Sequence, residues 1–584
     1  MKMLIAAIAA CLFEGYVLLN HVNKSTNTID ADAARQSVLQ YKQKFAVGCA
    51  ANAAAFNPDD SFNIIPLLNG WGNYRMPVTA TNDSARIYFE QGINMYYGFH
   101  IIEALASFDK STKFDSGFAM GYWGKALSYG PNINDYGYAA SPEALTAVAK
   151  AKALSGNCSP VEKGLINAMT VRYAADTTQT REHLNQLYAD AMQKVHAQFP
   201  ESLDAVVLYA DALMVQHPWD LYDRYGKPKA WTPLIVATLE EALKKNFRHP
   251  GAAHYYIHAV EASDHPERAL AVSDELPNLM PGVSHVVHMP AHIYIRTGNY
   301  AKGFGLNDKA VKGYEDYLRI YPAVVNNASL YLVHNLHMQA TCANMEGNYA
   351  DAMRISIDAR NSFDSSWLSL PDFMGIFVQY IYMTPVLTQI RFGKWDDILQ
   401  NAEIPSGYVY ASLLRHYARG LAFARKHDFV HAGNELAVLQ TGLKHDQLKA
   451  PAPNYANPGV NGARVAENIL QGVIAEEQNN LQRSITYLQQ AVELEDAMIY
   501  NEPKDWVHPA RQYLGTVLIK AGRYAEAEKV FKEDEAINPN NGWSYTGLVI
   551  ALKKQQKNKA AENVQQLLKK TFNRSDTKVT AAVF

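Results

Sequence analysis

Seven of the chain's 19 histidines stand at spacings that could bring their rings together. Residues three or four apart lie on one face of a helix. Two imidazoles on one face could hold a metal ion or hydrogen-bond an anionic ligand. The seven are His254 and His258, four residues apart; His288 and His292, also four apart; His285, three before His288; and His334 and His337, three apart.

A longer spacing places these pairs on neighbouring helices. His254 and His288 are 34 residues apart, and so are His258 and His292. Packed helices lie about 8–10 Å apart, so imidazoles from two of them can reach one ion at roughly 2.0–2.1 Å from each nitrogen. Neutral imidazole suits Zn, Cu, Fe or Ni. The seven histidines are therefore predicted to form a transition-metal site, whose metal the sequence does not identify.

Two charged residues near the histidines could take part in chemistry. Glu261 follows His258 by three residues and could be a metal ligand or a general base for metal-bound water. The competing interpretation is a buried carboxylate paired with Arg268 or Arg296. If the site is catalytic, we expect Glu261 to handle protons and Arg296 to orient an anionic group.

A second interpretation of the histidines involves no metal. They could hydrogen-bond an organic anion or a peptide, with Arg296 and Tyr255 assisting. In a third interpretation they satisfy one another and buried water, which is a purely structural role. The sequence does not decide among the three.

Other kinds of function lack support in the sequence. There is no GxGxxG or GxxxxGK[ST] motif in a strand-to-helix context, and no HExxH or GxSxG motif. The charge is nearly balanced, with 54 Lys+Arg against 57 Asp+Glu and no long basic run. We therefore expect neither nucleic acid nor an acidic membrane surface as a partner.

The elements that carry the histidines are predicted from a repeat near the C-terminus. Leu514-Gly515, Gly522-Arg523-Tyr524, Ala527, Phe531 and Pro539 fall at the offsets of the tetratricopeptide (TPR) consensus. Small residues let two helices approach, Gly522 ends the first helix and Pro539 stops the second. Weaker copies stand at 98–110, 297–300 and 346–350. The chain thus resembles the TPR family, which implies an all-α, TPR-like α-solenoid, a right-handed superhelix of helix-turn-helix repeats.

The resemblance gives the histidines a common register. With Gly298 and Gly347 at position 15 of the motif, and Asp264 as their equivalent one repeat earlier, the histidines fall at positions 2, 5 and 9. In TPR proteins positions 2, 5, 9, 12 and 13 face the concave groove, so the resemblance implies that all seven histidines point into one groove. Glu261 takes position 12 and Arg296 position 13.

A narrower resemblance concerns export. The segments HYYIHAVE (254–261) and HMPAHIYIRTG (288–298), together with 126–135 and 502–515, resemble exported bacterial-type TPR proteins; this implies fold and export, and no activity. The charged and apolar start of the chain is typical of an export signal. Cys11 ends a lipobox-like segment, so a lipoprotein, a plain signal peptide and an uncleaved anchor stay open. We expect a periplasmic or envelope location, with a membrane contacted only through such an anchor.

The organisation follows from these features. The predicted segments are 1–25, signal or anchor; 26–84, irregular; 85–205, N-terminal TPR-like repeats; 206–360, central repeats with the histidine-lined groove; 361–480, further hairpins with a Pro/Asn-rich loop at 446–464; and 481–584, C-terminal repeats.

The functional hypothesis is an exported TPR protein whose histidine-lined groove binds a transition metal. Whether it is a metal-dependent enzyme on a small or peptidic substrate is left open. The alternative is a non-catalytic adaptor that binds a peptide or protein partner in the same groove.

Overall fold

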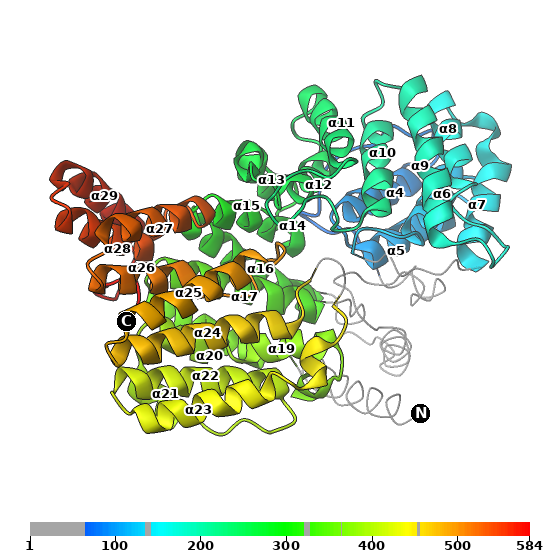
Figure 1. Cartoon of the computed structure of the whole chain (residues 1–584). Coiled ribbons are helices and arrows are strands. Elements are labelled where there is room, and N and C mark those ends of the chain that lie inside the picture. Colours follow the sequence, from blue (N-terminus) through cyan, green and yellow to red (C-terminus); the bar gives the residue numbers. More distant parts are fainter. Residues whose placement is uncertain (1–64, 135–141, 321–327, 364, 453–455) are drawn as a thin grey trace. The chain divides into compact units, whose positions relative to one another are not determined.

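The computed structural model describes residues 65–134, 142–320, 328–363, 365–452 and 456–584 (Figure 1). For the helical residues 318–320 and 328–330 only the backbone is described. The predicted signal segment, the lipobox with Cys11 and most of the predicted irregular region lie outside the described residues.

The described part of the chain is all-α, as predicted, and contains no β-strand. It divides into two compact units: unit 1 comprises the described residues of 1–290 and 309–331, and unit 2 comprises those of 291–308 and 332–584. The predicted central segment 206–360 therefore contributes to both units.

The helices of unit 1 each pack against the helix that follows along the chain. They are α4 (Asp83–Tyr97), α5 (Ile101–Phe114), α6 (Ala119–Ser128), α7 (Pro142–Leu154), α8 (Pro160–Met169), α9 (Arg181–Gln198), α10 (Leu203–Gln216), α11 (Thr232–Lys245), α12 (Pro250–Val260), α13 (Leu270–Leu279) and α14 (Ser284–His288), with 3-10 turns η3 (Ser155–Asn157) and η4 (Pro266–Ala269).

Three helices have residues in both units, and the helices that follow them along the chain belong to unit 2. The three are α15 (Pro290–Arg296), α16 (Tyr300–Ile320) and α17 (Ala328–Met345). Unit 2 continues with α18 (Tyr349–Asn361), η5 (Ser365–Ser369), α19 (Phe373–Tyr382), α20 (Thr384–Arg391), α21 (Trp395–Gln400), α22 (Val409–Arg425), α23 (Phe429–Gly442), η6 (Asp446–Lys449), α24 (Gly459–Glu477), α25 (Leu481–Asp496), α26 (Ala510–Lys520), α27 (Tyr524–Ile537), α28 (Gly542–Lys554) and α29 (Asn558–Thr571).

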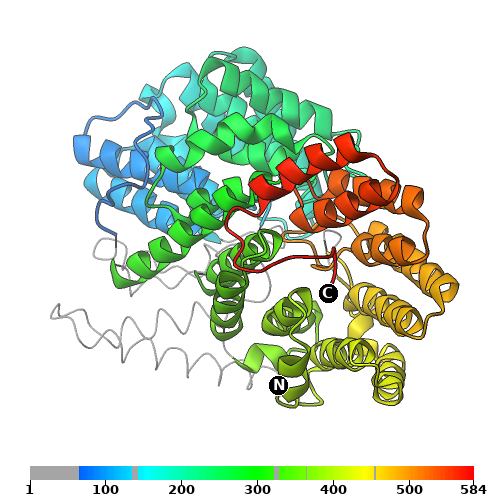
Figure 2. The ribbon, with the colours of Figure 1, turned by 90° about the vertical axis from the view of Figure 1, so that its left-hand side faces the viewer.

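Helical hairpins make unit 2 a TPR-like solenoid. The pairs α22 with α23, α24 with α25, α26 with α27 and α28 with α29 lie side by side (Figure 2). The predicted close approach at Gly515 is confirmed, because a Cβ there would lie 2.4 Å from the Phe531 ring. Gly547 of the next hairpin contacts the same ring, where a Cβ would lie 2.2 Å away.

The hairpin turns repeat one backbone feature. In seven turns of unit 2, a residue with φ between 59° and 73° follows the end of the first helix. This left-handed conformation favours glycine, which has no Cβ to clash. The glycines at 298, 347 and 522 confirm the predicted turns, and Gly393 adds a turn that the sequence search missed. The same conformation is held without glycine at His427, Asn479 and Gln556.

Two of these glycines provide a matched stability test. In Gly522→Ala the added Cβ has no neighbouring atom within 4 Å, but the alanine must adopt a φ of +73°. This strained backbone conformation should lower the free energy of unfolding by about 1–2 kcal/mol. At Gly298, with φ +70°, a Cβ would also lie 2.2 Å from the Pro539 carbonyl oxygen. Gly298→Ala should therefore cost roughly 1–3 kcal/mol more. Urea unfolding of both variants measures the difference, and equal losses would contradict the clash at Pro539.

No single helix among the described residues is long and apolar enough to cross a membrane. The bent pair α19 and α20, with 47° between its helices, meets the length and composition criteria together.

Candidate metal centre

Helix α12 of unit 1 presents two of the predicted histidines to the interior. Its start is fixed by Pro250 in the first turn and by His249, whose Nδ1 accepts a hydrogen bond from the Ala252 N–H at 3.2 Å. Every residue of the helix is buried. His254 is 0% exposed and His258 is 5% exposed, so both rings face protein.

A backbone carbonyl orients the ring of His254. Its Nδ1 lies 2.6 Å from the carbonyl oxygen of Tyr97, the last residue of α4. Because a carbonyl only accepts, Nδ1 carries the proton and donates it. The other nitrogen, Nε2, is therefore left with a lone pair.

A carboxylate orients the ring of His258 in the same way. Its Nδ1 lies 3.0 Å from Oε1 of Glu261, which is 1% exposed. Histidine ligands of metals characteristically donate their second N–H to a carboxylate or a carbonyl. Arg268, one of the partners considered for Glu261, pairs with Glu240 at 2.5 Å.

A third histidine completes the group from α14. Nε2 of His285 lies 3.2 Å from Nε2 of His254, and one ring nitrogen from each of His254, His258 and His285 lies within 4.8 Å of the others. Two nitrogens bound to one ion at about 2.1 Å, with an angle of about 100° between them, would be about 3.2 Å apart. The observed spacing therefore fits two ligands of one ion.

The electrostatics of the group favour the form of histidine that binds metal. Burial lowers the pKa of His258 to about 3. Burial, together with the neighbouring histidines, lowers the pKa of His254 and of His285 well below the ordinary value. All three rings are therefore neutral at physiological pH.

Aromatic side chains enclose the three histidines. The ring of Phe99 has centroid distances of 4.5 Å to His254, 5.7 Å to His258 and 5.8 Å to His285. Trp219 meets His258 edge-on at 5.2 Å, and Tyr331 lies 4.8 Å from His285. These rings limit the access of water to the group.

The other predicted histidines divide between the units. In unit 1, His288 lies beside His285, with ring centroids 5.6 Å apart. In unit 2, Nε2 of His292 lies 3.5 Å from Nε2 of His334. His337 is buried against Tyr380 at 5.8 Å, and burial lowers its pKa to about 3. The common groove for all seven histidines stays a prediction.

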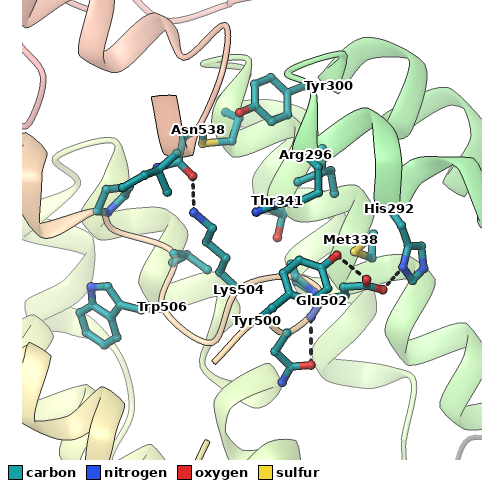
Figure 3. A pocket seen from close by; sticks show the side chains of 17 residues that line it. His292, Arg296, Tyr300, Met338, Thr341, Tyr500, Glu502, Lys504, Trp506 and Asn538 are labelled. Carbon is teal, nitrogen blue, oxygen red and sulfur yellow. Dashed lines mark hydrogen bonds and ion pairs between the residues drawn. The ribbon is translucent and has the colours of Figure 1, made fainter. Parts of the chain in front are cut away.

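The predicted residue Arg296 belongs to unit 2. Its guanidinium lies 5.2 Å from the centre of the Tyr500 ring. The Tyr500 hydroxyl donates to Glu502, which pairs with Nδ1 of His292 (Figure 3). Tyr255, considered as an anion-binding residue, is 1% exposed and packs against Phe99 in unit 1.

Sequence reasoning missed three residues around the histidines. Tyr97 and Phe99 are about 155 residues before α12, and no spacing rule joins such distant segments. Glu502 follows His292 by about 210 residues. Its only signal was the resemblance of 502–515 to exported TPR proteins.

No family model and no curated protein sequence matches the chain. Solved structures that resemble it include the human IFIT1 dimer with m7Gppp-AAAA, at 12% identity over 89% of this chain and 100% of that chain, with a TM-score of 0.28. Another is the APC/C hetero-tetramer Cut9-Hcn1, at 12% identity over 94% of this chain and 85% of that chain, with a TM-score of 0.26. Likenesses at this level leave the function to be argued from the chain's own residues.

Proposed function

We propose that unit 1 binds one transition-metal ion through Nε2 of His254, His258 and His285. The observation that carries the proposal is that Nδ1, and not Nε2, holds the proton on both His254 and His258. Both rings donate Nδ1–H to acceptors on their outer side, Tyr97 and Glu261. Their Nε2 lone pairs then face the same small space, where a cation satisfies them.

The same geometry argues against an anion at this place. An anion needs hydrogen-bond donors or positive charge, and the burial of these rings disfavours their protonation. In the metal-free chain, the two Nε2 atoms of His285 and His254, which lie 3.2 Å apart, form a hydrogen bond if Nε2 of His285 carries a proton and donates it. The structural interpretation thus describes the chain without metal, and a cation would replace that proton.

Three protein ligands leave room for a further ligand. Structural zinc sites usually use four protein ligands, whereas catalytic sites use three and keep a position open. The number of protein ligands is therefore that of a catalytic ion, which is the basis for proposing a metal-dependent enzyme on a small or peptidic substrate; the rings of Phe99, Trp219 and Tyr331 enclose this position in the structure. Glu261, whose Oε1 accepts the proton of His258, then has the role of orienting this ligand.

Metal analysis of the untagged full chain tests the proposal. After treatment with a chelator and reconstitution with Zn, Cu, Fe or Ni, we expect about one ion per chain, and none in His258→Ala/His285→Ala. The control is His249→Asn, which changes a buried histidine of unit 1 but keeps a residue suited to begin α12. Equal metal content in the double variant and in the parent would refute the site.

The outcome also separates the proposal from the adaptor alternative. A TPR adaptor would yield a stoichiometric protein partner whose binding is unaffected by chelator. Absence of metal from the reconstituted parent, together with such a partner, would favour the adaptor.

Glu261→Gln tests the orienting carboxylate. The amide keeps the size of the side chain but holds the His258 N–H more weakly, because it lacks the charge. We expect the metal affinity to fall about 10- to 100-fold, with the stoichiometry preserved at high metal concentration. Competition with a chelator measures the affinity. An unchanged affinity would mean that Glu261 does not act through His258.

A further inference from the structure

The loop between α10 and α11 carries one of the aromatic rings that enclose the three histidines of unit 1. This loop covers residues 217–231, and the two helices that it joins both pack against α12. The indole of Trp219 meets the His258 ring edge-on, with 5.2 Å between the ring centroids. Trp219 is partly exposed, whereas the other two enclosing residues, Phe99 and Tyr331, are 3% and 5% exposed. Of the three rings, that of Trp219 is therefore the one that solvent reaches most.

A four-residue turn holds Trp219 in a backbone conformation that tryptophan rarely adopts. The Asp220 N–H donates to the His217 carbonyl at 3.1 Å, so Pro218 and Trp219 are the two central residues of the turn. The φ of Trp219 is +59°. A positive φ at the third position of a turn, with proline at the second, is the pattern of a type II turn, where glycine or asparagine is usual. The chain thus keeps a large side chain where glycine would be less strained.

The same strain occurs at a second ring that contacts His258. Phe99, in the turn after α4, has a φ of +58°, and its ring centroid lies 5.7 Å from that of His258. In the described part of unit 1, Phe99 and Trp219 are the only residues other than glycine with a positive φ. Strained backbone conformations cluster at active sites and at the segments that close over ligands. Both strained residues of unit 1 therefore belong to the enclosure of the proposed metal position.

Contacts within the loop fix the backbone at both ends of this turn. The Trp231 indole N–H donates to the Asp220 carbonyl at 2.7 Å, and the Trp231 ring stacks on the His217 ring with 3.9 Å between centroids. Rotation of the Trp219 side chain is then the smallest movement that takes the indole away from His258. Such a rotation of a partly exposed side chain requires no displacement of a helix.

We propose that Trp219 is the gate of the metal position in unit 1 and that Phe99 is a fixed wall of it. With the indole against His258, the position is closed to water; with the indole turned outward, an ion or a small ligand reaches it from the 217–231 loop. This role rests on the proposed function, because it supplies the route by which a substrate enters an enclosed three-ligand site. One side chain thereby controls both the access of ligands and the exclusion of water.

Exchange of Co²⁺ in Trp219→Gly tests the gate. Glycine favours the backbone conformation of the turn, so this variant loses the ring without added strain. One aromatic contact favours the closed form by about 2- to 10-fold, so the rates of entry and release should both rise by about that factor. Because both rates rise together, the Kd and the stoichiometry should stay unchanged. Stopped-flow absorption of Co²⁺ measures entry into the full, chelator-treated chain, and addition of excess chelator measures release.

Two further variants separate the gate from a general change in the loop. Trp219→Phe keeps a smaller ring and should give rates between those of the parent and of Trp219→Gly. Tyr225→Gly also replaces an aromatic residue of the loop by glycine, but Tyr225 is 62% exposed, so its exchange rates should equal those of the parent. Thermal unfolding verifies that every variant folds.

The results distinguish failure of the gate from failure of the metal site. Co²⁺ bound by the parent, with both rates unchanged in Trp219→Gly, would overturn the gate and leave the metal site in place. Faster release with unchanged entry, and hence a higher Kd, would also overturn the gate, because the ring would then only stabilise the bound form. If the parent binds no Co²⁺, the metal site is refuted and the gate with it.

Discussion

Zn²⁺ at roughly a hundredfold excess over its Kd is expected to stabilise unit 1 by about 2.7 kcal/mol. The gain arises because the three imidazoles are assembled only in the folded unit, so the ion binds the folded state and hardly binds the unfolded chain. At a thousandfold excess the gain should reach about 4.1 kcal/mol. Denaturant unfolding followed with and without Zn²⁺ measures it, and a chelator should abolish it.

Variants distinguish this stabilisation from non-specific metal binding. His254→Ala removes one ligand and should remove most of the gain, whereas His249→Asn should keep it. His337→Ala in unit 2 is a further control, because this ring lies against Tyr380. If His254→Ala gains as much stability from Zn²⁺ as the parent, the ion binds elsewhere.

Much of the fold follows from local rules in the sequence. The repeat around Gly522 predicts the hairpin of α26 and α27, because the turn glycine and the small residue Gly515 act over a few residues. Turns such as those at His427 and Gln556 adopt the same backbone conformation without glycine. They cannot be recognised by composition, because the packing of the flanking helices imposes the conformation.

The candidate site was predictable in part. Helical spacing places His254 and His258 on one face, and both rings do reach one group with His285. The register predicts that His254 stacks with its equivalent one repeat later, His288, and this pairing stays a prediction. The structure shows a contact of His254 with His285, which the register did not single out. Residues that orient and enclose the rings, such as Tyr97 and Phe99, come from a distant helix and its following turn, so only the tertiary structure reveals them.

Acidification of the metal-free chain is expected to destabilise unit 1 before unit 2. The pKa of His254, His258 and His285 lies below the unfolded value of about 6.5, so on acidification the unfolded state binds protons first. Their stabilising contribution is present above pH 6.5 and is lost as pH falls. Asp211 opposes this, because burial raises its pKa to about 6 and favours its protonation in the folded state. Because three histidines act against one carboxyl, we expect a net loss of stability as the pH falls from 6 to 4.5.

In unit 2 the buried histidines and the buried carboxyl groups have nearly cancelling effects on the pH dependence of stability. Burial lowers the pKa of His337 to about 3 and that of His508 well below its ordinary value. Burial also raises the pKa of Glu346 to about 7 and of Asp505 to about 6, and raises that of Glu495. These carboxyls take up protons in the folded state and stabilise it as pH falls, which offsets the loss from the two histidines.

Hydrogen exchange resolved by segment can separate the two units. Between pH 6.5 and 5, after correction for the intrinsic rate, we expect protection to fall in α12 and α14 and to persist in α24 and α26. Zn²⁺ should restore protection in unit 1, because a bound ion occupies the lone pairs that protons would take. Asp211→Asn should steepen the loss in unit 1, since it removes the opposing carboxyl. Loss of protection in unit 2 first, or equally in both units, would show that the buried histidines of unit 1 do not control its acid stability.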